Sequence, residues 1–413
     1  MTVKPINLLL GHPSISLLPT KQLTHAVQEV FKSPRPGDND SENRHPLAYG
    51  PDQGAMDIRN TIGKWSAQRY GEDTIPGDHL HITGGASAGL LHALQQFTDP
   101  QYTKRAFVIS PVYYLASSVF EDAGYVGKMS AIPEGNTGCD LEMLKMLLAK
   151  YSSVPSKAVV PREGRERKMY KYVLYCVPTF SNPTGRVMDL ETRKGLVQLA
   201  REFDILIIAD DVYDFLHYTT SSKTTLPPRI ISIDKQDLQG DGNVLSNCTF
   251  SKLLGPGLRC GWIESPSPKL AYLLGIGGAN HSGGCASQWT SFTVEKMILG
   301  GETDAVISHL QETYGSRAKG MKEAIESRWG NVKIIGGHGG YFMWVRVDVD
   351  ARELVKRSHD LGVILANGDI FECPGDELGW GAHWVRVSVS YVELSDAVEA
   401  INMVGDIVDS MKK

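Results

Sequence analysis

The sequence predicts an α/β fold in which a mostly parallel sheet lies between helices and a smaller domain follows. In the middle of the chain, apolar runs rich in β-branched residues alternate with segments of helical periodicity, as in strand–helix–strand units. Past about residue 300 the pattern changes to a long helix, several strands and a final helix. The 413 residues, 42% of them hydrophobic, are enough to form both parts.

The strands of the expected sheet end where polar, Gly or Pro residues begin. The clearest candidates are 106–110, 172–177, 205–209 and 244–250. The segment 189–203 predicts a helix between two of them, because Asp189 can cap it and its apolar residues recur at helical spacing. Since the carboxyl ends of parallel strands meet at one edge of a sheet, we expect the functional residues there.

The smaller domain is expected to begin with a helix near 303–329. The final helix is amphipathic, and Ser390 and Glu393 have the spacing of a capping box ahead of it. We expect this helix to pack on the strand written "WVRVSVS".

Composition and charge exclude several kinds of partner. A net charge of -5 and a pI near 6.2 give no general reason to bind nucleic acid. The most basic stretch, 162–171, also holds two glutamates and is interpreted as a solvated surface insertion. The six cysteines are scattered singly, so we expect reduced thiols and no metal site. No run is long enough for a signal peptide or a membrane span, and we expect a cytoplasmic protein.

The segment "TFSKLLGPGLRCGW" carries the strongest local signal. Lys252 follows a strand end, where a desolvated amine near other cations stays partly neutral and can attack an aldehyde. Arg259 suits bidentate binding of a phosphate, and the hydroxyls of Thr249 and Ser251 could add donors. Taken alone, the segment is equally compatible with two ordinary surface cations.

This segment resembles the S-x-S-K-x-x-x-P-G-x-R-x-G motif of fold-type I aminotransferases. The stretch "VPTFSNPTGRVM" resembles the N-P-T-G segment of that family, and "IADDVYDFL" resembles its D-x-x-Y segment, in the same order. Further matches are "LAYGPDQGAMDIR", "TGGASAGL", "PVYY", "GGYFMWV" and "WVRVSVS". The resemblance runs from about residue 11 to residue 386, which is nearly the whole chain.

The resemblance implies the fold of the type I transferases that depend on pyridoxal 5′-phosphate. That fold has a mostly parallel seven-stranded sheet between helices and a smaller α+β domain. The expected division is an N-terminal segment at 1–45 that joins the smaller domain, a large cofactor-binding domain at 46–300 and the smaller domain at 301–413. Lys252 would hold the cofactor as a Schiff base, and a homodimer would share its active sites.

The resemblance also assigns roles around the cofactor ring. Asp210 would pair with the pyridine nitrogen, whereas Asp211 would point the other way across the strand. Asn182 and Tyr213 would donate to the phenolate oxygen of the ring. Tyr113 would stack on the ring, with Tyr114 as the alternative in the next register.

Phosphate and substrate are expected at two further places. The backbone N–H groups of Gly85, Ala86 and Ser87 would bind the phosphate at the start of a helix, together with Arg259, Ser251 and Thr249. Tyr49 would reach the phosphate of the neighbouring subunit. The substrate α-carboxylate would bind Arg386, beside Gly11 and Asn182.

The sequence departs from the aspartate-specific branch of the family. No arginine occurs between Arg259 and Arg317, and the corresponding stretch offers Asn280, His281, Ser282 and Gln288 instead. The stretch "LANGDIFE" also replaces the usual P-G-x-x-F. The start of the chain is closer to the branch that includes 2-aminoadipate, aromatic and broad-range aminotransferases.

The expected activity is therefore transamination from an L-amino acid (2-aminoadipate, aromatic or aliphatic) to a 2-oxo acid by a ping-pong mechanism, with 2-oxoglutarate as the expected acceptor. Two alternatives stay open. The first is a C–S β-lyase or another elimination enzyme with the same cofactor, and the second is a non-catalytic regulator that senses the cofactor.

Overall fold

The computed structural model describes residues 5–32, 44–158, 167–218 and 226–412, so part of the basic stretch at 162–171 lies outside the described residues. The strands are β1 (Ile6–Asn7), β2 (Leu80–Thr83), β3 (Arg105–Ser110), β4 (Met129–Pro133), β5 (Tyr172–Cys176), β6 (Ile205–Asp210), β7 (Val244–Thr249), β8 (Gly261–Glu264), β9 (Lys333–Gly336), β10 (Phe342–Arg346), β11 (Val363–Ile364), β12 (Ala366–Asn367) and β13 (Trp384–Ser388). The helices are α1 (Thr20–Lys32), α2 (Met56–Tyr70), α3 (Ala86–Phe97), α4 (Tyr114–Phe120), α5 (Leu141–Ser152), α6 (Leu190–Phe203), α7 (Ile230–Gln236), α8 (Pro268–Gly275), α9 (Gln288–Leu299), α10 (Glu302–Arg328), α11 (Ala351–Asp360) and α12 (Leu394–Met411).

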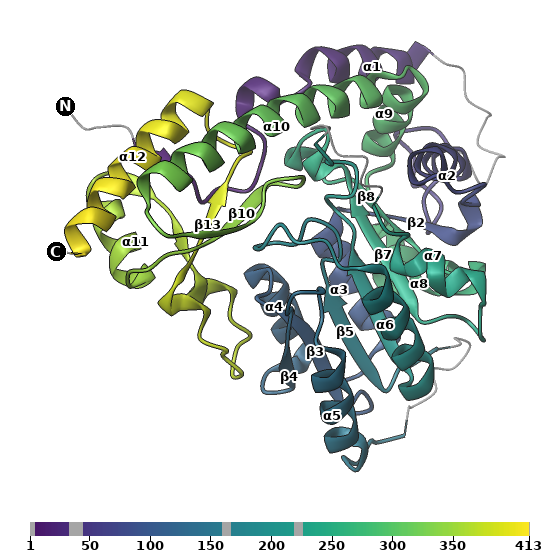
Figure 1. The fold of residues 1–413 in the computed structure, drawn as a ribbon. Coiled ribbons are helices and arrows are strands. Elements are labelled where there is room, and N and C mark those ends of the chain that lie inside the picture. The colour runs from purple at the N-terminus through teal and green to yellow at the C-terminus, as the bar shows by residue number, and fades with distance from the viewer. Residues whose placement is uncertain (1–4, 33–43, 159–166, 219–225, 413) are drawn as a thin grey trace.

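A seven-stranded sheet, called the large sheet below, occupies one half of the molecule (Figure 1). Its strand order is β2-β8-β7-β6-β5-β3-β4. The pairs among β7, β6, β5, β3 and β4 are parallel, and β8 runs antiparallel to both of its neighbours. The predicted α/β class and the mostly parallel seven-stranded sheet are confirmed.

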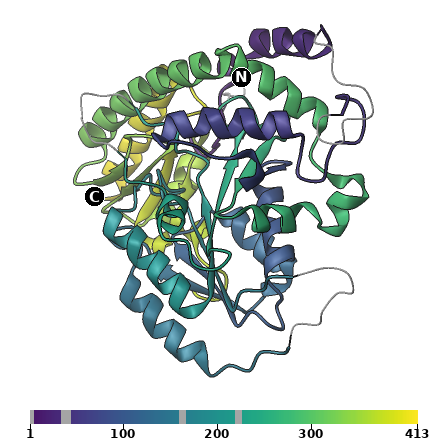
Figure 2. The same ribbon diagram turned by 90° about the vertical axis from the view of Figure 1, so that its right-hand side faces the viewer.

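Helices cover both faces of the large sheet (Figures 1 and 2). On one face, α3, α4 and α8 bury Leu90, Ala116 and Leu270 against strand residues such as Val108 and Ile208. On the other face, α5, α6 and α7 form a second apolar cluster with the alternate strand residues. Because both faces are buried, the central strands are almost continuously apolar rather than alternating.

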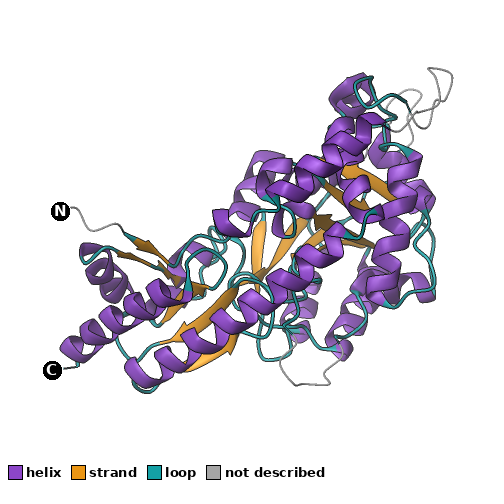
Figure 3. Ribbon diagram, turned by 90° about the horizontal axis from the view of Figure 1, so that it is seen from above, coloured by secondary structure: helices purple, strands orange, loops and turns teal. Residues whose placement is uncertain are grey.

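A smaller antiparallel sheet, called the small sheet below, has the order β12-β13-β10-β9. α10, α11 and α12 pack around it, and α12 buries its apolar face in the cluster that also contains Val385 and Val387 of β13. Both ends of the chain lie at this end of the molecule (Figure 3).

The N-terminal segment contacts both parts. β1 pairs in parallel with β11 beside the small sheet, whereas α1 packs against α9. The division of the chain at about residues 45 and 300 stays a prediction, and residues 1–4 and 33–43 of its first segment lie outside the described residues.

Two sequence expectations concerned helix caps. The side chain of Asp189 accepts a hydrogen bond from the backbone N–H of Thr192, so the predicted cap of α6 is confirmed. The capping box at Ser390 and Glu393 is wrong, because α12 begins at Leu394 and Ser390 lies too far before it. The hydroxyl of Ser390 donates to the backbone oxygen of His12 instead and ties down the N-terminal segment.

None of the helices in the described ranges is long and apolar enough to cross a lipid bilayer. The six cysteines all carry free thiols, and five of them are buried.

Candidate active site

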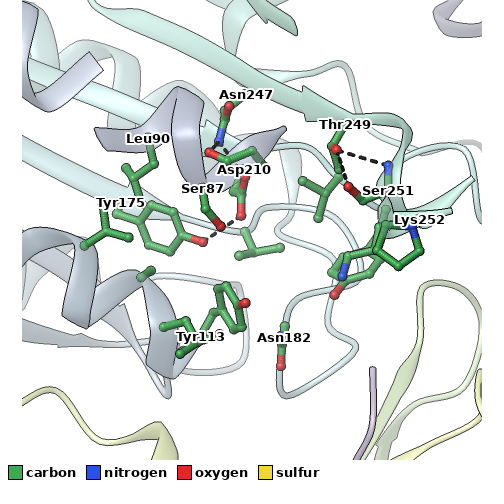
Figure 4. Close-up of a pocket in the computed structure, with 18 of the residues that line it drawn as sticks. Ser87, Leu90, Tyr113, Tyr175, Asn182, Asp210, Asn247, Thr249, Ser251 and Lys252 are labelled. Atoms are coloured by element: carbon green, nitrogen blue, oxygen red, sulfur yellow. Dashed lines mark hydrogen bonds between the residues drawn. The ribbon is translucent and has the colours of Figure 1, made fainter. Parts of the chain in front are cut away.

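A cavity of about 160 Å³ opens at the carboxyl ends of β5, β6 and β7, where the sequence predicted the functional residues (Figure 4). Tyr113 follows β3, Asp210 ends β6, and Thr249 ends β7. The predicted site residues that line the cavity are Ala86, Ser87, Tyr113, Asn182, Asp210, Tyr213, Thr249, Ser251, Lys252 and Arg259.

Asp210 is buried at one end of the cavity. Among the described residues, the side chains that donate hydrogen bonds to its carboxylate are all neutral. Tyr175 donates from its hydroxyl to Oδ2 at 2.7 Å, and Asn247 donates from Nδ2 to Oδ1 at 2.9 Å. Burial raises the pKa of Asp210 to about 6, and the hydrogen bond from Tyr175 opposes this rise. A carboxylate in this position is ready to accept a hydrogen bond from a cationic N–H group.

Asp211 is the first residue after β6, and its side chain points away from the cavity, as expected for the residue next to Asp210 along an extended chain. Its Oδ2 accepts a hydrogen bond from the hydroxyl of Ser246, and Asp211 does not line the cavity.

Lys252 is held in the turn that follows β7, three residues past the strand end. Its Nζ donates to the backbone oxygen of Gly11 at 3.3 Å, and its own backbone oxygen accepts a hydrogen bond from the hydroxyl of Tyr341 at 2.8 Å. Burial lowers the pKa of Lys252 to about 8, the negative charge of Asp210 raises it, and the cations Arg386 and Arg259 lower it further. The amine is therefore partly neutral near physiological pH.

Donors for an anion gather where α3 begins. Gly85 precedes the helix at φ 98°, a left-handed conformation that glycine adopts without strain, and a Cβ there would contact Nη2 of Arg259 at 2.7 Å. Nη2 of Arg259 donates to the backbone oxygen of Gly84 at 2.9 Å, and Nη1 lies 3.5 Å from the hydroxyl of Ser251. The hydroxyl of Thr249 donates to that of Ser251 at 2.9 Å. The arginine, the hydroxyls and the free N–H groups of the first helical turn converge here.

Arg386 comes from β13 of the small sheet and is buried beside the cavity. Nη1 donates to the side-chain oxygen of Asn182 at 2.7 Å, and Nη2 donates to the backbone oxygen of Leu9 at 2.6 Å. The guanidinium lies 4.0 Å from the ring centroid of Phe342 and 4.8 Å from that of Phe371. Its Nε is buried with no hydrogen-bond acceptor among the described residues, so a donor remains for a carboxylate.

The aromatic residues resolve the register of the "PVYY" segment. Tyr113 lines the cavity, and burial raises the pKa of its hydroxyl to about 12. Tyr114 does not line the cavity, and its ring lies 6.1 Å from that of Phe371. Tyr213 also lines the cavity, and the Nζ atom of Lys252 lies 5.7 Å from its ring centroid.

Four predicted residues are not part of the cavity lining: Gly85 and Arg386, described above, and Gly11 and Tyr49. Gly11 reaches the site through the backbone oxygen that accepts from Lys252, and a Cβ on it would overlap the ring of Phe342. Tyr49 is 75% exposed and lies against Gly283, outside the cavity. Within the described chain, Tyr49 therefore does not contact the residues that would hold the cofactor phosphate of the same subunit.

The residues that replace the second arginine do not enter the cavity. Asn280 hydrogen-bonds to His81, and His281 pairs with Asp52 at 2.8 Å. Gln288 donates to the backbone oxygen atoms of residues 44 and 45.

Sequence reasoning missed several lining residues. Tyr175 and Asn247 are the two donors to Asp210, but each lies inside a buried strand, where it reads as part of the core. An amide in the middle of the buried strand β7 was the one available signal, because a buried amide needs partners. The other missed residues are apolar: Leu90, Leu115, Ala116, Val119, Val177, Val212 and Pro256.

The donor set fits pyridoxal 5′-phosphate. The cavity has a buried carboxylate at one end, an arginine with hydroxyls and a helix N-terminus at another, and a partly neutral lysine that lines the same space. These groups match the ring nitrogen, the phosphate and the aldehyde of that cofactor.

Comparison with known proteins gives the same answer. Residues 14–401 match the family model described as aminotransferase class I and II. An uncharacterized protein of Saccharomyces cerevisiae is 39% identical over 99% of this chain and 98% of its own length. Aromatic-amino-acid aminotransferase 1 of Thermococcus litoralis is 26% identical over 99% of this chain and 89% of its own length. The crystal structure of Pyrococcus horikoshii kynurenine aminotransferase in complex with PMP has a TM-score of 0.79 and 26% identity, and the match covers 100% of this chain and 92% of that chain.

Proposed function

The chain belongs to the class I and II aminotransferases, enzymes that depend on pyridoxal 5′-phosphate. We propose that it moves the amino group of an aromatic, aliphatic or 2-aminoadipate donor to a 2-oxo acid, with 2-oxoglutarate as the acceptor. The observation that carries the proposal is that Lys252 and Asp210 line one cavity and that Arg386 is hydrogen-bonded to Asn182, which lines the same cavity. The two half-reactions would use this one site in turn.

We propose these roles for the residues of the cavity. When bound, the cofactor supplies an aldehyde that condenses with amines and a ring that accepts electrons from the substrate Cα. Asp210 would accept the hydrogen bond of the ring nitrogen, and Tyr113 would pack on the ring face. Arg259, the hydroxyls of Ser251 and Thr249, and the first N–H groups of α3 would hold the phosphate.

Lys252 has two tasks in the proposal. It would bind the cofactor covalently. After release, its neutral amine would remove the proton from the substrate Cα and deliver it to the carbon that comes from the cofactor aldehyde. A pKa of about 8 supports this, because an amine that transfers protons in both directions works best near the pH of its surroundings.

Arg386 would bind the substrate α-carboxylate, for which its unpartnered Nε is available. The apolar wall around the cavity, which includes Val119, Val177 and Val212, and the lack of an arginine among the side chains at 280–288 favour the aromatic and aliphatic donors over 2-aminoadipate, whose side chain carries a carboxylate. The relatives named for aromatic amino acids and kynurenine support this range of donors.

Two further points belong to the proposal. The exposed Tyr49 supports a homodimer in which this residue reaches the cofactor phosphate of the partner subunit. The free cysteines support a reducing compartment, for which we propose the cytoplasm.

The test is a single half-reaction. Purified enzyme loaded with the cofactor is mixed with a panel of amino acids and no oxo acid. Transamination predicts loss of the carbonyl absorbance of the cofactor and one 2-oxo acid released per site, without ammonia. Steady release of ammonia with pyruvate from cysteine conjugates would instead identify a β-lyase, and no reaction with any donor would identify a regulator.

Covalent attachment is tested separately. Borohydride reduction of the loaded enzyme, followed by peptide mass analysis, should place the cofactor mass on the peptide that contains Lys252. A label on any other lysine would overturn the assignment.

A further inference from the structure

Residues 371–380, called the strap below, connect the small sheet to the large sheet beside the active site. The strap begins at Phe371, the last residue of the short helical turn Gly368–Phe371 that comes directly after β12. It ends at Trp380, the first residue of the turn Trp380–Ala382 before β13. In Figure 1 it is the yellow-green loop that extends from the region of β13 towards α4 and β4. β12 and β13 are neighbouring strands of the small sheet, so both ends of the strap are fixed there.

Three hydrogen bonds join the strap to the large sheet and to the turn that follows β3. The backbone oxygen of Phe371 accepts from the N–H of Val112 at 2.9 Å. Oδ2 of Asp376 accepts from the N–H of Ala131 in the edge strand β4 at 2.9 Å. Nε1 of Trp380 donates to the hydroxyl of Ser110, the last residue of β3, at 3.0 Å.

An apolar anchor accompanies these bonds. Cys373 is fully buried and belongs to the core cluster formed by one face of the large sheet, together with Val108, Met129 and Ala131. A loop of the small sheet therefore contributes a side chain to the core of the large sheet. Withdrawing the strap would expose this side chain and leave the N–H of Ala131 without its protein acceptor.

The strap is also braced internally. Oε2 of Glu372 accepts from the N–H of Leu378 at 2.7 Å, and Oε1 accepts from the N–H of Trp380 at 2.5 Å. Gly368 lies so close to the backbone of Trp380 that any side chain there would overlap it. The strap is therefore a compact, closed loop.

The strap contacts residues on the substrate side and on the cofactor side of the proposed site. The ring of Phe371 lies 4.8 Å from the guanidinium of Arg386, which would bind the substrate carboxylate. Val112, bonded to the strap, is the residue before Tyr113, which lines the cofactor cavity. The strap therefore helps to fix the position of Arg386 relative to the cavity, in addition to the direct hydrogen bond from Arg386 to Asn182.

We propose that the strap is a positioning element, and that Trp380 and Asp376 are positioning residues that hold Arg386 at a fixed place beside the cavity before substrate arrives. The inference rests on the proposed role of Arg386. In the alternative arrangement, the strap would be free in the unliganded enzyme and would dock only when substrate binds, as a lid does.

The first test is hydrogen exchange in the cofactor-loaded enzyme without substrate. We expect the amides of Val112 and Ala131 to be strongly protected, and saturating 2-oxoglutarate to leave their exchange rates unchanged. Unprotected exchange of these two amides in the free enzyme would overturn the proposal, because the strap would then be a lid.

The second test uses Trp380→Phe, which keeps an aromatic ring but removes the hydrogen bond from Nε1 to the hydroxyl of Ser110. We expect KM for the amino donor to rise about tenfold, as for the loss of one hydrogen bond, with kcat and cofactor affinity nearly unchanged. The matched control is Trp329→Phe, which removes an indole hydrogen bond to the backbone oxygen of Ile401, away from the large sheet. Its KM should stay at the wild-type value even if its unfolding midpoint falls.

The outcomes separate this inference from the proposed function. An unchanged KM in both Trp380→Phe and Asp376→Ala would show that the strap only supports the fold, and transamination would stand. A failure of the half-reaction with every donor would remove the proposed function, while the exchange measurement would still report whether the strap is docked.

Discussion

Arg386 donates from Nη1 to the side-chain oxygen of Asn182 at 2.7 Å, although Arg386 lies on β13 of the small sheet and Asn182 lies in the loop that follows β5 of the large sheet. Since this oxygen is occupied, the NH₂ group of Asn182 is the part left to donate to a ligand in the cavity that it lines. One amide therefore links the proposed carboxylate-binding residue to the proposed cofactor site. A shift of the small sheet would therefore move Asn182, and with it a proposed hydrogen bond to the cofactor.

Arg386→Lys tests the carboxylate-binding role. A lysine keeps the positive charge but cannot form two parallel hydrogen bonds, so we expect kcat/KM to fall about 10- to 100-fold for both amino acid and oxo acid. Steady-state kinetics with each substrate measure this. Arg357→Lys on α11, where Arg357 pairs with Glu353 at the surface, is the matched control. Equal kcat/KM in the two variants would reject the role of Arg386.

Asp210→Asn tests the partner of the ring nitrogen. The amide has nearly the same shape but no charge, so we expect affinity for pyridoxal 5′-phosphate to fall by about 10- to 100-fold, the range for a lost hydrogen bond to a charged group. Titration of the apo enzyme with the cofactor, followed by absorbance, gives this affinity directly. Tyr175→Phe removes only one donor to the same carboxylate and should have a smaller effect. Wild-type affinity in Asp210→Asn would be incompatible with the assignment.

The pKa of Lys252, lowered to about 8 by burial, predicts a pH dependence. The amine loses its proton as pH rises through this value, so its acylation in the apo enzyme should increase from about pH 7 to about pH 9, with a midpoint near 8. Mass spectrometry of the Lys252 peptide measures the rate, and the exposed Lys145 in the same sample reports the reactivity of the reagent. In Asp210→Asn the midpoint should move to lower pH, because the charge of Asp210 raises the pKa of Lys252.

Glu134→Gln tests what holds the loop that carries Asn182. The buried carboxylate of Glu134 accepts hydrogen bonds from the hydroxyl of Thr184 at 2.8 Å and from Nε of Arg186 at 3.1 Å. An amide can satisfy only one of these two donors, so we expect the free energy of unfolding to fall by about 1–3 kcal/mol. Urea denaturation measures the change. Glu142→Gln removes an exposed pair with Lys145 and should change it by less than about 0.5 kcal/mol, and a similar loss in both variants would contradict the prediction.

The sequence predicted the parts of the fold that depend on local pattern. The strands that end at Asp210 and Thr249, and the helix capped by Asp189, are found within about a residue of their expected bounds. Apolar runs bounded by turn residues determine these elements, and the motif residues follow their ends. For the same reason, the cavity contains most of the residues that the motifs indicated.

Contacts between distant segments could not be predicted in this way. The bond from Tyr175 to Asp210 depends on the register of two neighbouring strands, and the burial of Cys373 depends on a loop that crosses from one sheet to the other. The capping box at Ser390 failed because a contact with His12, nearly 380 residues away in sequence, uses the serine hydroxyl. Such partners become visible only once the chain is folded.

The strap has a further consequence for the open side of the large sheet. β4 is an edge strand, and an edge with free N–H and C=O groups can recruit a strand from another molecule. Here Asp376 occupies the N–H of Ala131, Arg105 occupies the oxygen of Met129, and Pro133 has no N–H to offer. Loss of the strap would therefore make the protein prone to aggregate through the exposed edge of β4, independently of any effect on turnover.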